Sequence, residues 1–184
     1  MSKERSMYFE IQCPDNDTVW LPDATTLCPA CGCKTSRDHW NPDFVLKKTR
    51  YDLGVTYDGF YIASERFKAI ADTLPGRKSF VPLPPRAHYR RQYYLMELLD
   101  EVRIDVARAA PEFGPMCGRC GQHRYIVGAR ASFSQDMRAD TGLVRSDLQF
   151  ADGKEKGYAL LVGAEAGEVL AQARLDGLWL EVVE

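Results

Sequence analysis

The feature that most constrains the fold of this chain is a five-residue motif, CxxCG, that occurs twice. The first copy is CPACG, from Cys28 to Gly32, and the second is CGRCG, from Cys117 to Gly121. A tetrahedral zinc ion needs four ligands, and each copy offers two thiolates in a tight loop. The glycine that ends each copy allows a positive φ, which lets backbone N–H groups point at the sulfurs. Each motif is therefore predicted to form a zinc knuckle, a loop that holds two ligands.

The two knuckles together predict one shared structural zinc site. Its four ligands would be Cys28, Cys31, Cys117 and Cys120. Four thiolates leave no open position for water or substrate. The alternatives are a redox CxxC pair or thiols without a metal, but a redox pair is expected at the start of a helix, and GCKTSRD after Cys31 has no helical apolar period. A deaminase-type catalytic zinc is disfavoured because no His-x-Glu accompanies the cysteines.

Three residues near the knuckles leave alternatives open. Cys33 could compete as a ligand, although we expect it to be a thiol beside the site. His39 and His123 each follow a knuckle, and each is either an outer partner of the metal site or an exposed loop histidine. No catalytic histidine–carboxylate unit and no glycine-rich phosphate loop is recognisable. We therefore expect that the protein is not an enzyme.

A longer repeat accompanies the knuckles. The segment from Phe60 to Leu83 aligns without a gap on Ala159 to Val182 at an offset of 99 residues. In the first copy the apolar residues have the spacing of one face of a short helix, and Ser64 stands where its N-cap would be. Those apolar residues are Phe67, Ile70, Ala71 and Leu74. The apolar runs on either side predict strands, so each copy predicts a strand-helix-strand unit.

These patterns predict an α+β fold in one zinc-stabilised domain over residues 1–184. It would consist of two related β-rich halves, roughly 20–90 and 110–184, each with a knuckle and a strand-helix-strand unit, pinned by the shared zinc. Two strands are expected between Tyr93 and about Ala107, and Trp179 is expected in a terminal strand as a core residue. Structural zinc contributes on the order of 10 kcal/mol or more to the folding of small domains.

Composition and charge narrow the range of functions that the chain can have. With 184 residues, 45% of them hydrophobic, and a net charge of −2, the chain is typical of a soluble globular protein. Neither a leader nor an apolar run of membrane-spanning length is present, so we expect a cytoplasmic protein without a membrane partner. The charge balance gives no overall attraction to nucleic acid. One local basic cluster keeps a zinc-ribbon nucleic-acid-binding protein as the alternative function. It consists of Arg86, His88, Arg90 and Arg91.

The chain resembles a known family, the double-CXXCG motif proteins, a paralogous set in myxobacteria regarded as immunity proteins of polymorphic toxin systems. The resemblance rests on the two CxxCG motifs, on WLPDATTLCPACG from Trp20, on IASERF from Ile62, and on YYLMELLDEVRIDVARA from Tyr93. It implies a cytoplasmic protein that binds and neutralises a cognate toxin, usually encoded by a neighbouring gene. A metal-pinned scaffold suits that role, because a preorganised surface loses less entropy on binding.

Overall fold

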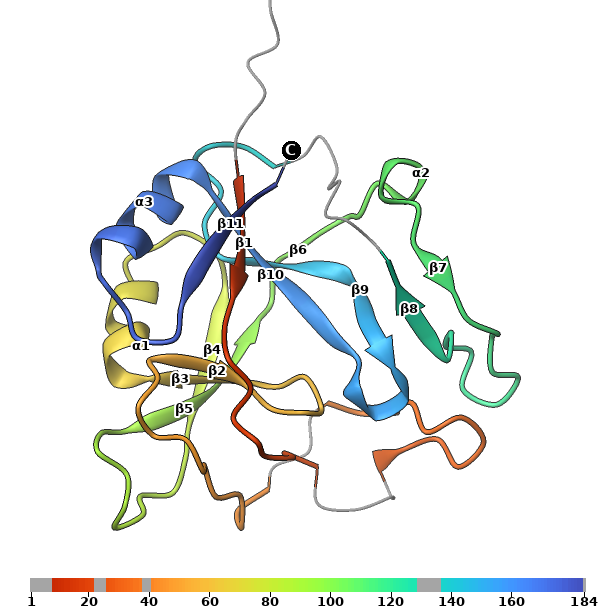
Figure 1. The fold of residues 1–184 in the computed structure, drawn as a ribbon, viewed down its shortest axis with the longest axis horizontal. Coiled ribbons are helices and arrows are strands. Elements are labelled where there is room, and N and C mark those ends of the chain that lie inside the picture. The colour runs from red at the N-terminus through yellow and green to blue at the C-terminus, as the bar shows by residue number, and fades with distance from the viewer. Residues whose placement is uncertain (1–7, 22–25, 38–40, 129–136, 184) are drawn as a thin grey trace, which may run out of the picture.

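A computed structural model describes residues 8–21, 26–37, 41–128 and 137–183. The fold is α+β and dominated by two β-sheets, with the helices α1 (Glu65–Ala71) and α3 (Ala164–Gln172) on the same side of the molecule (Figure 1). The larger sheet has the strand order β11-β1-β10-β9-β8-β7, and β6 pairs in parallel with β9. Its strands are β1 (Tyr8–Gln12), β6 (Glu101–Val102), β7 (Glu112–Phe113), β8 (Tyr125–Val127), β9 (Val144–Asp152), β10 (Gly157–Gly163) and β11 (Trp179–Val183).

The smaller sheet has the order β2-β3-β5-β4, and all its neighbouring strands are antiparallel. Its strands are β2 (Leu53–Val55), β3 (Tyr61–Ser64), β4 (Lys78–Pro82) and β5 (Tyr93–Leu98). The helical segments of the chain are α1 (Glu65–Ala71), α2 (Val106–Ala109), α3 (Ala164–Gln172) and the 3-10 turn η2 (Gly153–Glu155). None of the helices in the described ranges has both the length and the apolar composition that a membrane span requires.

Both aligned segments form a strand, a helix and a strand. β3, α1 and β4 make the first unit, and β10, α3 and β11 make the second. α1 begins as its sequence indicates, because the side chain of Ser64 accepts a hydrogen bond from the backbone N–H of Phe67 at 3.1 Å. α3 begins at the equivalent position, after Gly163, without a side-chain cap. The constant offset in sequence therefore corresponds to the same order of elements in space.

The likeness between the units extends to their sheets. In the smaller sheet β5 lies between β3 and β4, and in the larger sheet β1 lies between β10 and β11, antiparallel to both neighbours in each case. β2 flanks β3 as β9 flanks β10. The inserted strand follows the first unit along the chain, whereas in the second unit it comes from the N-terminal segment at residues 8–12, outside the predicted range 110–184. The division of the whole chain into two halves remains a prediction.

One apolar core lies between the units. It contains Phe67 and Ala71 of α1 together with Ala166 and Leu170 of α3, and all four are almost fully buried. Strand residues of both sheets complete it. They include Ile11, Leu53, Ala63, Met96, Leu160 and Val162. Because each helix buries its apolar face against this common core, the two units support one another.

Two expectations about particular segments need correction. Between Tyr93 and about Ala107 the two expected strands form as β5 and β6, but the segment ends in the helix α2, whose N-cap is Asp105. Trp179 does lie in the terminal strand β11, but it is 53% exposed, so its assignment to the core is wrong. β11 is an edge strand, and three of its five residues, Trp179, Glu181 and Val182, are exposed.

Candidate metal centre

The two knuckles have nearly the same backbone. In the first, the N–H of Cys28 donates to the carbonyl of Cys33 at 2.8 Å, and the N–H of Gly32 donates to the carbonyl of Cys28 at 2.7 Å. In the second, the corresponding bonds from Cys117 and Gly121 both measure 2.9 Å. Gly32 and Gly121 have φ values of +73° and +71°, which a glycine adopts at little cost. The local sequence therefore builds the same loop twice.

The fold brings these loops together although they are far apart in sequence. The first lies between β1 and β2, and the second between β7 and β8; both are on the same side of the molecule (Figure 1, orange and green loops at the right). The four sulfur atoms lie within 4.8 Å of one another. Cys28 Sγ is 3.9 Å from Cys117 Sγ, and Cys31 Sγ is 3.5 Å from Cys120 Sγ. The cysteines predicted from sequence therefore form one cluster compatible with a metal site.

The distances can be compared with those in a tetrahedral thiolate site. A Zn–S bond of about 2.3 Å places two sulfurs about 3.8 Å apart across a tetrahedral ion. The Cys28–Cys117 and Cys31–Cys120 sulfur separations, 3.9 and 3.5 Å, lie close to this value. They are too long for a disulfide, in which the sulfurs are about 2.05 Å apart, and all six cysteines of the chain are free. The donor set and its spacing thus fit a tetrahedral ion.

The electrostatics of the cluster also favour a cation. Backbone N–H groups of Cys120 and Arg119 lower the pKa of Cys117 to about 6, and the N–H of Ala30 lowers the pKa of Cys28. The N–H group of Cys33 likewise acts to lower the pKa of Cys31, and the N–H group of Gln122 acts to lower the pKa of Cys120. Burial and the neighbouring thiols nevertheless raise the pKa of both to about 11. Four adjacent thiolates repel one another, and a bound cation removes that penalty.

The neighbouring residues are not part of the four-sulfur cluster. Cys33 is fully buried, and its Sγ lies 3.6 Å from the backbone carbonyls of both His123 and Arg124. His123 uses its Nδ1 in a hydrogen bond of 2.8 Å with the carbonyl of Gly114, and its ring packs against Phe113. These contacts hold the second knuckle in place. His39 lies outside the described residues.

Two buried lysines near the knuckles were not anticipated from sequence. Lys34 Nζ donates to the backbone carbonyls of Asp58, Lys154 and Lys156, and burial lowers the pKa of this lysine to about 7. Lys156 Nζ donates in turn to the carbonyl of His123 at 2.9 Å. Lys34 therefore links the first knuckle to the β9–β10 turn, and Lys156 links that turn to the second knuckle. No periodic signal in sequence distinguishes such lysines from exposed ones, because the acceptors are backbone atoms of distant segments.

The basic cluster is largely engaged within the protein. Arg91 forms an ion pair with the buried carboxylate of Asp52. The ring of His88 makes a hydrogen bond of 3.0 Å with the carbonyl of Leu46, and Arg86 donates to the carbonyl of Pro42 at 3.3 Å. These side chains therefore have a structural use that needs no nucleic acid.

Comparison with known proteins adds no family assignment. The sequence matches no model of a known protein family, and no curated protein matches it either.

Proposed function

We propose that the four-cysteine cluster binds one zinc ion and that this zinc has a structural role. The observation that carries the proposal is the approach of four sulfurs, two from each knuckle, to within 4.8 Å of one another. Soft thiolate donors in a tetrahedral set select zinc over magnesium or calcium. The ion would join segments 89 residues apart, Cys28 to Cys117 and Cys31 to Cys120, and so stabilise contacts that are entropically costly to form.

We further propose that the protein is an immunity protein that binds and neutralises a cognate toxin in the cytoplasm. This proposal rests on the resemblance to the double-CXXCG motif family, and the cysteine cluster supports it because both motifs contribute equally to one site. Four protein ligands leave the ion no position for substrate. A scaffold fixed by the ion can present a preorganised surface to its partner.

Co-expression tests this function directly. The chain and the toxin-like gene encoded beside it should be expressed together from separately inducible promoters. We expect growth that is arrested by the toxin alone to be restored by the chain, and the two proteins to co-purify at a fixed stoichiometry. A matched control is Asp140→Asn, which alters an exposed ion pair outside both knuckles and should protect fully. Absence of protection by a soluble, zinc-loaded chain would contradict the proposal.

A further inference from the structure

The C-terminal strand β11 leaves one edge of the larger sheet open. It is the last strand in the order of that sheet, and no strand of the described chain pairs with its outer side. Its five residues, WLEVV, include neither proline nor lysine, which often protect an edge strand from pairing. An edge of this kind can accept another strand through backbone hydrogen bonds.

The hydrogen-bond pattern shows which backbone groups of β11 point outward. Gly163 donates its N–H to the carbonyl of Thr141 at 2.8 Å, away from β1. Backbone groups alternate in direction along a strand, so the β1 residue one place further along, Phe9, bonds to β10. Phe9 is opposite Val182 in β11, and the N–H and C=O of Val182 therefore point away from β1. By the same alternation, those of Leu180 point outward too.

The corresponding edge in the first strand-helix-strand unit is protected. Pro82 of β4 and Val182 of β11 hold equivalent places, because each lies opposite the residue that follows the partner of the helix N-cap. Pro82 has no N–H to offer to another strand. The edge of β2 is covered instead, since the N–H of Asn16 donates to the carbonyl of Val55 at 2.8 Å. β11 has neither form of protection.

The side chains of β11 indicate what kind of strand would fit. Trp179 and Val182 are both 53% exposed. Side chains alternate along a strand, so Trp179 and Glu181 share one face, and Leu180 and Val182 share the other. An added strand would therefore place apolar residues beside Leu180 and Val182 and one residue directly opposite Glu181.

The residue opposite Glu181 should be basic. On its inner side Glu181 is directly opposite Glu10 of β1. Neither carboxylate has an ion-pair partner among the described residues. Burial and the charge of Glu181 both raise the pKa of Glu10. Like charges opposite one another destabilise a sheet, and a lysine or arginine on an added strand would relieve that repulsion.

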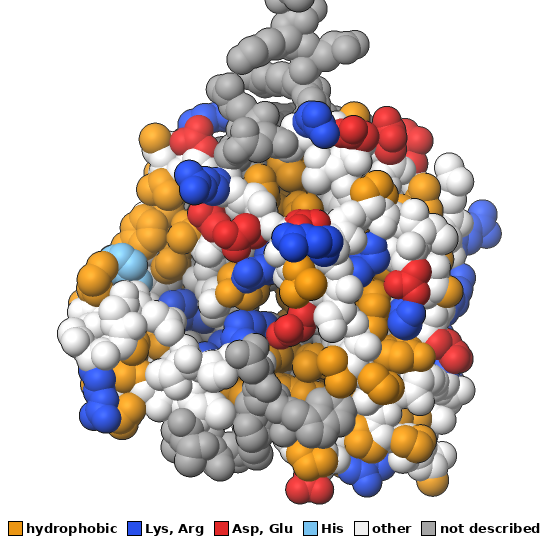
Figure 2. Space-filling model, turned by 180° about the vertical axis from the view of Figure 1, so that it is seen from behind, with side chains coloured by type: hydrophobic (Ala, Val, Ile, Leu, Met, Phe, Trp, Pro, Cys, Tyr) orange, Lys and Arg blue, Asp and Glu red, His pale blue; other side chains and the backbone are white. Residues whose placement is uncertain are grey.

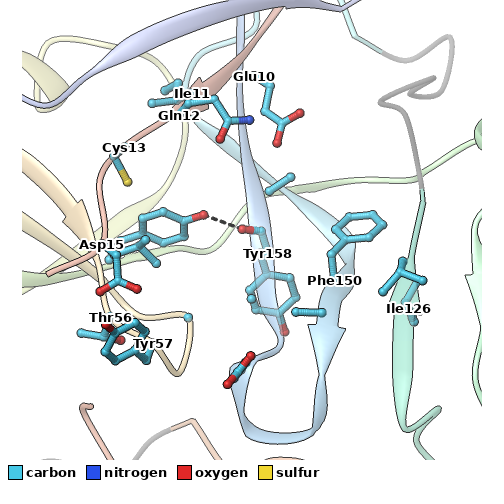
Figure 3. Close-up of a pocket in the computed structure, with 18 of the residues that line it drawn as sticks. Glu10, Ile11, Gln12, Cys13, Asp15, Thr56, Tyr57, Ile126, Phe150 and Tyr158 are labelled. Atoms are coloured by element: carbon cyan, nitrogen blue, oxygen red, sulfur yellow. Dashed lines mark hydrogen bonds between the residues drawn. The ribbon is translucent and has the colours of Figure 1, made fainter. Parts of the chain in front are cut away.

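The surroundings of Glu10 are acidic as well. A cavity of about 560 Å³ beside β1 is lined by Glu10, Asp15 and Glu155 and by no lysine or arginine. Figure 3 shows Glu10 and Gln12 close together near the top of this cavity and Asp15 lower down. On the face seen from behind, by contrast, lysine and arginine side chains lie among the acidic ones (Figure 2). The field near Glu10 and Glu181 thus favours a cation.

A second copy of this chain would fit the edge poorly. In an antiparallel pair of two β11 strands, the register that pairs all five residues places Glu181 opposite Glu181 of the second copy. The carboxylates of Glu10 and Glu181 from both copies would then lie in one row across four strands. A strand with a basic residue at that position avoids this repulsion.

We propose that the outer edge of β11 binds an extended segment of a partner protein, with a lysine or arginine of that segment opposite Glu181. The unprotected edge, the outward backbone groups of Leu180 and Val182, and the Glu10–Glu181 pair carry this inference. It does not depend on the proposed immunity function or on the identity of the metal.

NMR titration of the full-length, metal-loaded protein with designed peptides tests the proposal. The probe is the peptide TTVKVTT, N-methylated on the threonines next to the valines so that the edge facing away from β11 is blocked. One control peptide has glutamate in place of lysine, and the other carries the methyl groups on the valines. We expect the probe to shift the amide signals of β11, the glutamate peptide to bind about fivefold or more weakly, and the valine-methylated peptide not to bind.

Variants of β11 separate the backbone from the charge. Val182→Pro removes an outward N–H and should weaken probe binding about tenfold or more, while Pro82 at the equivalent place indicates that the fold tolerates it. Glu181→Gln keeps the backbone but should reduce the preference for the lysine peptide to about twofold or less. Glu168→Gln, at an exposed position of α3, should leave that preference unchanged.

The peptides and Glu181→Gln keep the test decisive if Val182→Pro fails to fold. Four results would overturn the proposal. They are unshifted β11 signals at millimolar probe, equal binding of the lysine and glutamate peptides, unchanged probe binding in folded Val182→Pro, or self-association of the chain that Val182→Pro abolishes.

Discussion

Cys33 and Gln122 occupy equivalent positions in the two knuckles, and each side chain donates to the backbone of the other knuckle. The thiol of Cys33 lies 3.6 Å from the carbonyl of His123, and Nε2 of Gln122 lies 2.7 Å from the carbonyl of Lys34. His123 and Lys34 are themselves equivalent, since each pairs across its own knuckle with the residue before the first cysteine. The two knuckles are therefore related by an approximate twofold, and the cysteine cluster lies where they meet.

Loss of one sulfur from the cluster should weaken both metal binding and folding. We expect Cys28→Ser or Cys117→Ser to lower the zinc content after dialysis and to reduce Tm by roughly 5–15 °C. Loss of one of the four ligands is expected to remove several of the roughly 10 kcal/mol that structural zinc contributes to folding, and 1 kcal/mol corresponds to about 2–4 °C in a chain of this size. Metal analysis and calorimetry on the same samples measure both effects.

Cys33→Ser is the matched control for those variants. Cys33 lies beside the cluster and not in it, and a serine hydroxyl can still donate to the carbonyls of His123 and Arg124. We expect full zinc content and a change in the free energy of unfolding of about 1 kcal/mol or less. Loss of zinc from Cys33→Ser, or its retention by Cys28→Ser, would contradict the ligand set.

In the metal-free protein the four thiols should differ in reactivity. Backbone N–H groups lower the pKa of Cys117 from 9.0 to about 6, whereas the pKa of Cys120 is raised to about 11. Only the thiolate is nucleophilic. Limited iodoacetamide treatment at pH 7, read out by peptide mass spectrometry, should therefore modify Cys117 well before Cys120, and added zinc should protect both. Faster modification of Cys120 would contradict the assigned electrostatics.

The same shift predicts a pH dependence of stability. Because the pKa of Cys117 is lower in the folded state than in the unfolded state, its ionisation favours folding most above about pH 9, and this contribution is lost as the pH falls through about 6. Protons also compete with metal for the thiolates, so acidification should release the ion. We expect Tm to fall between pH 8 and pH 5 and to fall less in Cys117→Ser. An equal decrease in both proteins would contradict the role of this thiol.

The buried carboxylate of Asp52 should be important for stability. It accepts hydrogen bonds from Ser64 at 2.7 Å and from the N–H of Asp176 at 2.9 Å, and it pairs with Arg66 and Arg91. Both arginines are partly exposed and can be hydrated when their partner is lost. We therefore expect Asp52→Asn to destabilise the fold by about 2–3 kcal/mol, measured by urea unfolding.

Asp140→Asn provides the comparison for Asp52. Asp140 pairs with Arg138 at 3.3 Å, but the two side chains are 61% and 78% exposed. Such a pair contributes little, so we expect a change of about 0.5 kcal/mol or less in the free energy of unfolding. Similar changes in the free energy of unfolding for the two substitutions would contradict the argument that burial makes the interactions of Asp52 more stabilising.

The knuckle glycines should be sensitive because of their backbone conformation. Gly32 and Gly121 have positive φ but nothing within 4 Å of an added Cβ, so alanine at either position would meet backbone strain and no steric clash. We expect Gly32→Ala or Gly121→Ala to cost about 1 kcal/mol in chemical unfolding. Gly118→Ala is the control, because Gly118 has the same open surroundings without a positive φ. A cost at Gly118 equal to that at Gly121 would argue against this explanation.

The sequence predicts local features well and long-range partners less well. The cysteine cluster follows from two motifs whose chemistry requires four sulfurs, and α1 follows from its apolar spacing and the Ser64 cap. The insertion of β1 between β10 and β11 has no local signature, since it depends on a contact between the two ends of the chain. Lys34 and Arg37 look like surface residues in sequence. In the fold, Lys34 donates to the carbonyl of Lys156 and Arg37 stacks on the ring of Tyr158, so the contacts of both residues come from segments that are distant in sequence.

X-ray absorption spectroscopy at the zinc edge, combined with metal analysis, tests the central claim most directly. The four-cysteine cluster predicts one zinc per chain with four sulfur neighbours at about 2.3 Å and no oxygen or nitrogen neighbour. A first shell containing nitrogen or oxygen, or two knuckles that load zinc independently of each other, would contradict a single shared site.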